Sequence, residues 1–337
     1  MSWLFVLSVI FGGGAAEIFR PDNHSSYLNV RTRVPSLYNL SSDQTTGSYW
    51  TSSFLTTTSG SQYLALSHVL GNVCKSSLLE LDSLDYWNNL QYATPQNTSL
   101  AAAPGFKLSV GTCGIGSTSS DLISSMYTHA STPQYAFNLT WESTSKVLLN
   151  GGNAAFAFGP GFANSTEWSI PAAAVSGSLS LGNTSHTVDP ATSMTWYDHQ
   201  KGAGSPQNWT WFQLHFPGSS TKASIWAYDF GSPSFDTYRF ATVRVGEESQ
   251  YVIPFDMEAG GACGSWTSTK SNITYPQTWT LKFENGDVLD VQSLRGDQEI
   301  YGSRQLSDTV YAGYVNVSGS FLGQERGFGV VEMIKLY

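Results

Sequence analysis

An acid and an imidazole stand side by side in the stretch Trp-Tyr-Asp-His-Gln at residues 196–200. Asp198 and His199 are groups that can give or take a proton, so they are the candidate catalytic residues for general acid chemistry such as the loss of a hydroxyl as water. Side chains alternate along a strand, which predicts Trp196 and Asp198 on one face and Tyr197 and His199 on the other. Only one of these pairs can line a given pocket unless a bulge intervenes.

Residues 208–230 predict a hairpin with its turn near residues 217–220. In the first strand of this hairpin, residues 208–215, alternation places Trp209, Trp211, Gln213 and His215 on one face. Broad rings with a few hydrogen-bonding tips are typical of pockets for mostly apolar ligands, and the alternative is that these rings fill a barrel interior. The pocket candidates on this hairpin are Trp209, Trp211, Gln213, Trp226 and Tyr228.

Motifs for common cofactors and nucleophiles are missing from the sequence. It contains no phosphate-binding P-loop, no dinucleotide-binding glycine pattern after a strand, no H-E-x-x-H helix and no G-x-S-x-G elbow. The six histidines are scattered without short metal-ligand spacings. We therefore expect a protein that uses neither a metal ion nor a cofactor.

Short runs of β-branched and aromatic residues, separated by Gly, Pro, Asn and Ser, predict an all-β chain with few short helices. Asn285-Gly286, flanked by alternating apolar residues, is a strong hairpin signal. The best helical candidate is residues 76–91, where Leu79, Leu84 and Trp87 could share one face.

The chain of 337 residues is long enough for two domains. The apolar run from Trp3 to Phe11, followed by small residues up to Ala16, predicts a signal peptide at residues 1–16, although a buried first strand is the alternative. Turn residues crowd between 177 and 193, so we expect an N-terminal β domain at 17–187 and a C-terminal β domain at 188–337. These features predict a secreted protein, or one in the lumen of a secretory compartment.

Nine N-x-S/T sequons support entry into the secretory pathway, since random placement would give roughly four. The predicted glycosylation sites are Asn23, Asn39, Asn97, Asn138, Asn164, Asn183, Asn208, Asn272 and Asn316. Three cysteines, Cys74, Cys113 and Cys263, allow one disulfide and three pairings. Cys113 and Cys263 both lie between glycines, where loops could bring them together, so we expect that pair.

The formal net charge is −9, and acids and bases are interspersed without a basic stripe. This pattern argues against nucleic acid and anionic lipid as partners. No segment after the signal peptide approaches the roughly 18 apolar residues of a membrane span, so we expect no stable membrane insertion. A small hydrophobic substrate is the expected partner.

Three stretches together resemble the carotenoid 1,2-hydratase/AttH-like family. They are W-Y-D-H-Q-K-G at 196–202, W-T-W-F-Q-L-H at 209–215 and G-F-G-V-V-E-M-I-K-L-Y at 327–337. The resemblance implies two lipocalin-like β-barrel or β-sandwich domains with a ligand pocket in or between them. Asp198 matches the family's Asp, which implies that Asp198 and Trp196 face the pocket, with His199 as a second acid candidate. The same comparison suggests Trp50, His68 and Glu332 as further substrate contacts.

Two positions depart from the family pattern, because His199 stands where Arg is common and Lys201 where Trp is common. Family members include hydratases and fungal Diels-Alderases, and the sequence looks most like hetero-Diels-Alderases of tropolonic sesquiterpene pathways. The resemblance thus implies a cofactor-independent pericyclase acting on a polyketide or terpenoid, with or without a prior dehydration to a quinone methide. The alternatives are a hydratase or hydro-lyase, and a secreted lipocalin-like or carbohydrate-binding protein without catalysis.

Overall fold

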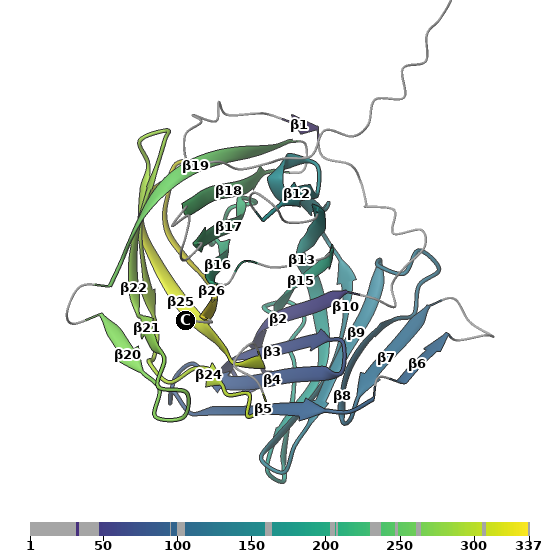
Figure 1. Cartoon of the computed structure of the whole chain (residues 1–337). Coiled ribbons are helices and arrows are strands. Elements are labelled where there is room, and N and C mark those ends of the chain that lie inside the picture. The colour runs from purple at the N-terminus through teal and green to yellow at the C-terminus, as the bar shows by residue number, and fades with distance from the viewer. Residues whose placement is uncertain are drawn as a thin grey trace, which may run out of the picture.

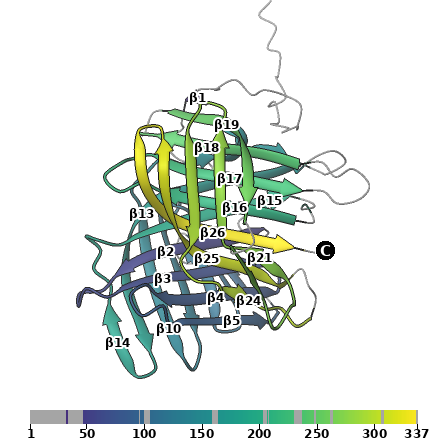
Figure 2. The same cartoon turned by 90° about the vertical axis from the view of Figure 1, so that its left-hand side faces the viewer.

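The computed structural model describes residues 32–33, 47–94, 96–99, 105–158, 164–202, 206, 208–229, 237–246, 249–260, 264–304 and 308–335. Within these ranges helical structure is confined to short 3-10 turns such as η1 (Asn150–Gly152), and the other regular structure is β-strand. The strands form two large antiparallel sheets that curl into barrel-like bodies and pack against each other (Figures 1 and 2). The prediction of an all-β, two-barrel chain is confirmed.

The first sheet has the order β5-β4-β3-β2-β15-β13-β10-β9-β8-β7-β6, with β11, β12 and β14 also paired to β13. Its strands are β2 (Ser48–Thr56), β3 (Gln62–Leu70), β4 (Val73–Glu80), β5 (Tyr86–Tyr92), β6 (Gln96–Ser99), β7 (Phe106–Val110), β8 (Cys113–Ser117), β9 (Ser125–Ser131), β10 (Tyr135–Ser143), β11 (Leu148–Leu149), β12 (Ala155–Ala157), β13 (Asn164–Leu181), β14 (Thr184–Thr187) and β15 (Met194–Gly202). The sheet curls so that β8 contacts β3 and β4 across an apolar interior.

The second sheet has the order β1-β19-β18-β17-β16-β26-β25-β23-β22, and β24 also pairs with β25. Because β19 pairs with β22, eight of these strands close into a barrel. Its strands are β1 (Thr32–Arg33), β16 (Asn208–His215), β17 (Lys222–Asp229), β18 (Thr237–Val245), β19 (Ser249–Ala259), β22 (Thr278–Phe283), β23 (Val288–Ser293), β24 (Glu299–Ile300), β25 (Val310–Phe321) and β26 (Gln324–Lys335). A separate two-stranded ribbon contains β20 (Ser265–Thr267) and β21 (Thr274–Pro276).

Both predicted hairpins are present. β16 and β17 pair directly, and β22 and β23 are joined through Gly286, whose φ of 88° suits glycine. The predicted helix at 76–91 is wrong, because β4 and β5 occupy this region. Leu84 in the connection has φ of 62°, outside the helical range, and pairing with β3 outweighs the local helical pattern.

The chain passes from the first sheet to the second between Gly202 and Asn208. Position 187, where the sequence suggests the domain boundary, is the last residue of β14 within the first sheet. The strand after it, β15, pairs with β2 and β13 of the same sheet. This pairing places the Trp196–Gln200 stretch in the first barrel, beside the second.

A third apolar cluster lies between the two barrels and joins them. Hydrogen bonds also cross this interface, because Gln250 on β19 accepts from the backbone N–H of Leu149 (3.0 Å) and donates to the backbone carbonyl of Gly152 (2.7 Å). The hydroxyl of Thr242 on β18 accepts from the N–H of Gly151 (3.0 Å). The η1 turn of the first body is thus fixed to two strands of the second.

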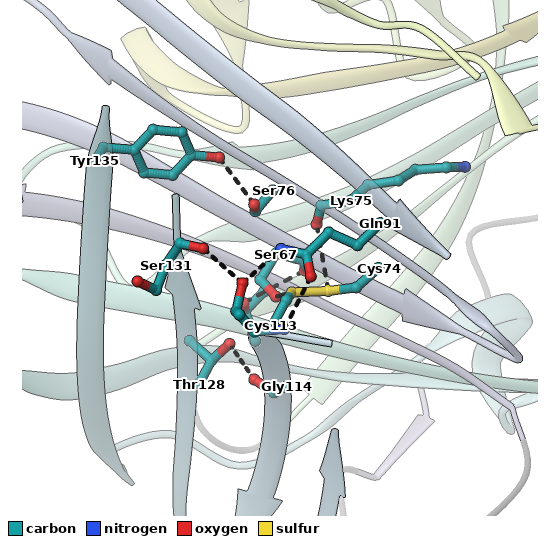
Figure 3. Close-up of a disulfide and its surroundings, with 12 residues drawn as sticks. Ser67, Cys74, Lys75, Ser76, Gln91, Cys113, Gly114, Thr128, Ser131 and Tyr135 are labelled. Carbon is teal, nitrogen blue, oxygen red and sulfur yellow. Dashed lines mark hydrogen bonds between the residues drawn. A yellow bond between two sulfur atoms is a disulfide. The ribbon is translucent and has the colours of Figure 1, made fainter. Parts of the chain in front are cut away.

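Cys74 on β4 and Cys113 on β8 form a disulfide, with their Cα atoms 6.2 Å apart (Figure 3). The predicted Cys113–Cys263 pair is therefore wrong. The glycines beside Cys113 suggested a loop, but Cys113 begins a strand that packs against β3 and β4 inside the first barrel. Cys263 lies outside the described residues.

Five sequon asparagines are exposed on the surface. They are Asn138, Asn164, Asn183, Asn272 and Asn316. Asn208 is buried at 7% exposure, so the fold gives it no room for a glycan. Asn23, Asn39, the side chain of Asn97 and the predicted signal peptide lie outside the described residues. No helix in the described part of the chain is long and apolar enough to cross a membrane.

Candidate active site

A row of side chains crosses the first sheet at one level, because each member is paired in register with the next. The row runs from Ser169 on β13 through Asp198 on β15, Trp50 on β2 and His68 on β3 to Lys75 on β4. Neighbouring residues on paired strands point to the same side of a sheet. Five residues from five strands thus form one polar and aromatic stripe facing the second barrel.

β13 is irregular just after Ser169, its member of this row. Its register with β15 shifts between Ile170 and Ala173, and Pro171 lies within the shift. Proline has no N–H to give to a ladder, so a bulge is a position where a sheet tolerates it. From Tyr197 to Gln200 the register is regular, and Asp198 keeps its place opposite Ser169.

The second barrel supplies the opposite wall from its own row. Trp226 on β17, Trp211 on β16 and Glu332 on β26 are paired in register. The indole of Trp211 lies 5.8 Å from that of Trp50 at an angle of 85°, and 5.9 Å from that of Trp226. Aromatic walls from both barrels therefore meet at this level.

A cavity of about 290 Å³ lies between the two rows. Its lining residues are Gly47, Ser48, Trp50, His68, Leu70, Ser165, Asp198, Gln200, Gly202, Trp209, Trp211, Trp226 and Glu332. The structure thus brings together seven of the residues singled out in the sequence. These seven are Trp50, His68, Asp198, Trp209, Trp211, Trp226 and Glu332.

Four other candidate residues do not line the cavity. Trp196 is fully buried in the interface cluster, and the hydroxyl of Tyr228 donates to the backbone carbonyl of Ala157 (3.3 Å). His199 points into the first barrel, stacked on Trp168 with ring centroids 5.7 Å apart. Strand alternation explains this position, since Asp198 occupies the face toward the cavity, and His199 is not in place to act on a substrate there.

The fourth residue, Gln213, ties the barrels together instead of facing the cavity. Its carbonyl oxygen accepts from the indole N–H of Trp50 (3.2 Å), and its amide nitrogen donates to the hydroxyl of Ser52. Gln213 is fully buried, so both bonds are shielded from water.

Replacing this amide should weaken the fold. Gln213→Leu leaves the Trp50 N–H and the Ser52 hydroxyl unpaired in the interface, and we expect a loss of about 1–3 kcal/mol in unfolding free energy. Denaturant titration measures this loss. Gln324→Leu, at the partly exposed start of β26, is the control and should stay within about 0.5 kcal/mol. Equal effects of the two changes would contradict the bridging role.

The pKa of the Asp198 carboxyl lies well above the usual range of an aspartate. Burial raises its pKa to about 7, the hydrogen bond from Ser169 acts in the opposite direction, and the charge of Glu332 raises the pKa further. A carboxylic acid that keeps its proton near pH 7 can serve as a general acid. Asp198 also faces the cavity, so its proton lies where a substrate would bind.

Glu167 is a second buried acid, and it did not stand out in the sequence. It lies two residues before Ser169 on β13, fully buried, and accepts hydrogen bonds from Trp226 Nε1 (3.0 Å) and Asn150 Nδ2 (2.9 Å). Burial and the nearby charge of Asp198 raise its pKa well above the usual range. The signal that could have revealed it is a lone acid between Thr166 and Trp168 in a strand otherwise free of charge.

Glu332 and His68 face each other from opposite barrels. Glu332 Oε2 accepts from the indole of Trp209 (3.1 Å), and its Oε1 lies 3.9 Å from His68 Nδ1. His68 Nε2 lies 2.7 Å from the hydroxyl of Ser48. Burial, with the charge of Lys75, lowers the pKa of His68 to about 3, so the imidazole is neutral.

Lys75 is a further buried ionisable residue near the cavity, beside His68 in the sheet. It is 4% exposed, and the negative charges of Glu332 and Asp308 act on its ammonium group. Its side chain extends away from the neighbouring disulfide (Figure 3). Burial lowers the pKa of Lys75, and the charges of Glu332 and Asp308 oppose this fall. Burial raises the pKa of Glu332, and the hydrogen bond from Trp209 and the charge of Lys75 oppose this rise. Glu332 therefore holds a negative charge more readily than Glu167.

Within the ranges that the structure covers, no group of three or more His, Cys, Asp or Glu side chains is arranged to hold a metal ion. The site offers instead a cavity with aromatic walls, a buried acid on one side and a second carboxyl with a neutral imidazole on the other. This arrangement can transfer a proton to and from an apolar molecule.

Known proteins resemble this chain over most of its length. The model of a family described as AttH-like matches residues 85–335. Kievitone hydratase of Fusarium solani subsp. phaseoli is 35% identical over 327 residues, covering 94% of this chain and 90% of that protein. Dehydratase asqC of Emericella nidulans is 35% identical over 334 residues, covering 94% of each.

Solved structures show the same fold. The crystal structure of kievitone hydratase from Nectria haematococca superposes with a TM-score of 0.80 at 32% identity and covers 94% of this chain and 98% of that one. A structure described as AttH, from Nitrosomonas europaea, has a TM-score of 0.71 at 15% identity, covering 88% and 95% of the two chains. The second similarity concerns the fold alone.

Proposed function

This chain belongs to the AttH-like family, and from this premise we propose that it adds water to, or removes water from, a small hydrophobic substrate held between the two barrels. Its relatives carry the names hydratase and dehydratase. The observation that carries the proposal is the pairing of a buried acid, Asp198, with Glu332 and His68 across one apolar cavity. Addition and removal of water are the two directions of one reaction, and both need one acid and one base.

Asp198 is the acid in this proposal. For hydration, its carboxyl gives a proton to one carbon of a double bond, and the positive charge moves to the neighbouring carbon. In the reverse direction, dehydration, Asp198 as a carboxylate takes this proton back from the carbon next to the cation. A raised pKa keeps the proton on Asp198 near neutral pH and makes it available at the cavity wall.

Glu332 is the base on the opposite wall. Its carboxylate takes a proton from the water that attacks the cation. In the reverse direction the Glu332 carboxyl gives that proton to the leaving hydroxyl, which departs as water. Trp209 and Lys75 favour its ionised form, and His68 beside it is neutral. The two carboxyls thus end a turnover with their protons exchanged, and transfer of the proton back to Asp198 restores the starting state.

The tryptophan rings suit the charge that forms between these two groups. Trp50, Trp211 and Trp226 surround the cavity with ring faces and edges, and indole faces attract a cation most strongly among aromatic side chains. A site with few water molecules strengthens this attraction. Substrates that give a tertiary cation, such as trisubstituted alkenes and tertiary alcohols, fit this wall best.

Isotope exchange tests the proposal directly. A panel of apolar trisubstituted alkenes and the matching tertiary alcohols is incubated with the protein in water enriched in oxygen-18. We expect oxygen-18 in the product alcohol and its exchange into the substrate alcohol. Retention of an apolar molecule without any exchange would favour a carrier, and retention of an oligosaccharide would favour a carbohydrate-binding protein.

The cycloaddition suggested by the sequence stays a prediction. The names of the relatives refer to water chemistry, and a cavity of about 290 Å³ is at the small end of ligand pockets, which favours one substrate over two. Dehydration to a quinone methide is a step that this site could also perform. A product whose mass equals the sum of two fragments less water would then support the cycloaddition.

The pH dependence of turnover should reveal the titration of Asp198. As the pH rises through about 7, Asp198 loses its proton and can no longer give one, so turnover in the hydration direction should fall about tenfold for each further pH unit. Initial rates under substrate saturation between pH 5 and 9 measure this limb. A falling limb with the same midpoint in the residual activity of Asp198→Asn would assign the limb to another group.

Secretory entry is also part of the proposed function. The buried Cys74–Cys113 disulfide is typical of oxidising compartments, and five sequon asparagines lie on the surface. Both observations support folding in the secretory pathway. Mass spectrometry of the protein from a eukaryotic host tests this, with cleavage after Ala16 and occupied sequons as the expected result.

A further inference from the structure

The outer face of the first barrel carries a groove of about 500 Å³ that is remote from the cavity between the barrels. Strands β7, β9, β10, β13 and β14 form it, and its polar lining includes Lys107, Tyr127, His129, Asn138 and Ser178. These side chains point away from the apolar interior, because they alternate with the core residues of the same strands. The proposed water chemistry makes no use of this groove.

Two aromatic rings lie flat on the sheet at this groove. The rings of Tyr127 and His129 on β9 are nearly parallel, with an angle of 20° between their planes and 6.4 Å between their centroids. Each of the two residues is paired with a glycine on β8. A Cβ on Gly116 would come within 2.4 Å of the Tyr127 ring, and a Cβ on Gly114 within 2.7 Å of the His129 ring. The glycines therefore leave the space into which these rings fold down.

The inner face of each ring covers the backbone of a glycine, which accounts for the contacts of that face. It does not explain the outer faces, since both side chains stay partly exposed and face the groove. A flat aromatic surface edged by an ammonium and hydroxyl groups is suited to a sugar ring. The C–H face of a pyranose gains by burial against an aromatic ring, and its hydroxyls hydrogen-bond to polar side chains.

A sequon lies in the same groove. Asn138 begins the sequence Asn-Leu-Thr on β10, is exposed, and is paired directly with His129. Thr140, the third sequon residue, is paired with Tyr127 and shares this face with Asn138. A glycan attached to Asn138 would therefore start next to both rings.

We propose that Asn138 carries an N-linked glycan whose first N-acetylglucosamine packs on Tyr127, so that this sugar is part of the outer surface of the first barrel. The proposal rests on secretory entry but not on the water chemistry. The occupant is the protein's own glycan because the attachment point lies within the groove, which makes the local concentration of the sugar very high. The packed sugar covers the platform that the glycines create.

A double-mutant cycle tests the contact in protein secreted from a eukaryotic host. Peptide mapping first gives the occupancy of Asn138. Thermal unfolding is then compared for the wild type, Asn138→Gln, Tyr127→Val and the double variant. We expect the thermal unfolding midpoint of Asn138→Gln to lie about 2–4 °C below that of the wild type. The double variant should unfold at a midpoint no lower than that of the less stable of the two single variants.

Two controls separate this contact from other effects of glycosylation. Asn183→Gln removes an exposed sequon in the turn between β13 and β14, and should shift the midpoint by less than about 1 °C. Trimming the glycans to a single N-acetylglucosamine should leave the wild-type midpoint unchanged. An unmodified Asn138, or additive effects of Asn138→Gln and Tyr127→Val, would overturn the proposal. Unchanged catalysis in Asn138→Gln would keep this result distinct from a failure of the proposed function.

Discussion

Asp198→Asn is expected to lower turnover by roughly 10²- to 10⁴-fold while the protein stays folded. Asparagine has nearly the same shape as aspartate and can still accept the hydrogen bond from Ser169, but its amide can neither give nor take a proton as an acid or base. Steady-state kinetics with the substrate found by oxygen-18 exchange measures the loss. Thermal unfolding of the same variant shows whether the fold is intact.

Glu167→Gln is the matched control for this change. Glu167 is another buried carboxyl on the first barrel, but it does not line the cavity, and burial keeps it protonated. Glutamine replaces a neutral acid with a neutral amide, so turnover should change less than about tenfold. Equal losses of turnover in the two variants would show that the buried carboxyls act on stability or on cavity shape. An unfolded Asp198→Asn variant would assign Asp198 a structural role.

Removal of the Cys74–Cys113 disulfide is expected to lower the unfolding free energy by about 3–4 kcal/mol. The two cysteines are 39 residues apart, and cross-linking a loop of this length removes that much chain entropy from the unfolded state. Both cysteines are buried, so the Cys74→Ala/Cys113→Ala variant also loses some packing. Denaturant unfolding of this variant against the wild type measures the difference.

Cys263→Ser is the control, because it removes a cysteine and leaves the Cys74–Cys113 bond in place. Its midpoint should stay close to that of the wild type, and a reducing agent should lower the midpoint of both. If the double variant were as stable as the wild type, the bond would not contribute to the fold. The disulfide holds β4 against β8, and Lys75 follows Cys74 on that strand, so unlinking should also disturb the charged side of the cavity.

Strand periodicity in the sequence was a reliable guide to which way side chains face. Alternation separated Trp211, which lies in the interface, from Phe212 and Leu214, which lie inside the second barrel. The same argument separated Asp198 from His199. It works because a strand turns successive side chains to opposite faces whatever surrounds it.

Local pattern failed where long-range pairing decided the structure. Residues 76–91 have apolar spacing that fits a helix, yet β4 and β5 form there because β3 offers a complete ladder. Cys113 looks like a loop residue beside its glycines, but curling of the sheet brings it to Cys74. Neither partner can be read from nearby residues.

The sequence by itself therefore determined the β class, the hairpins, the faces of single strands and the set of aromatic and acidic residues available for chemistry. Only the tertiary structure decided which of them meet. Asp198, Trp50 and His68 come together through strand register, and Glu332 reaches them only because the second barrel docks on the first. The pKa of Asp198 follows from the same docking, since burial raises it and burial is a property of the assembled interface.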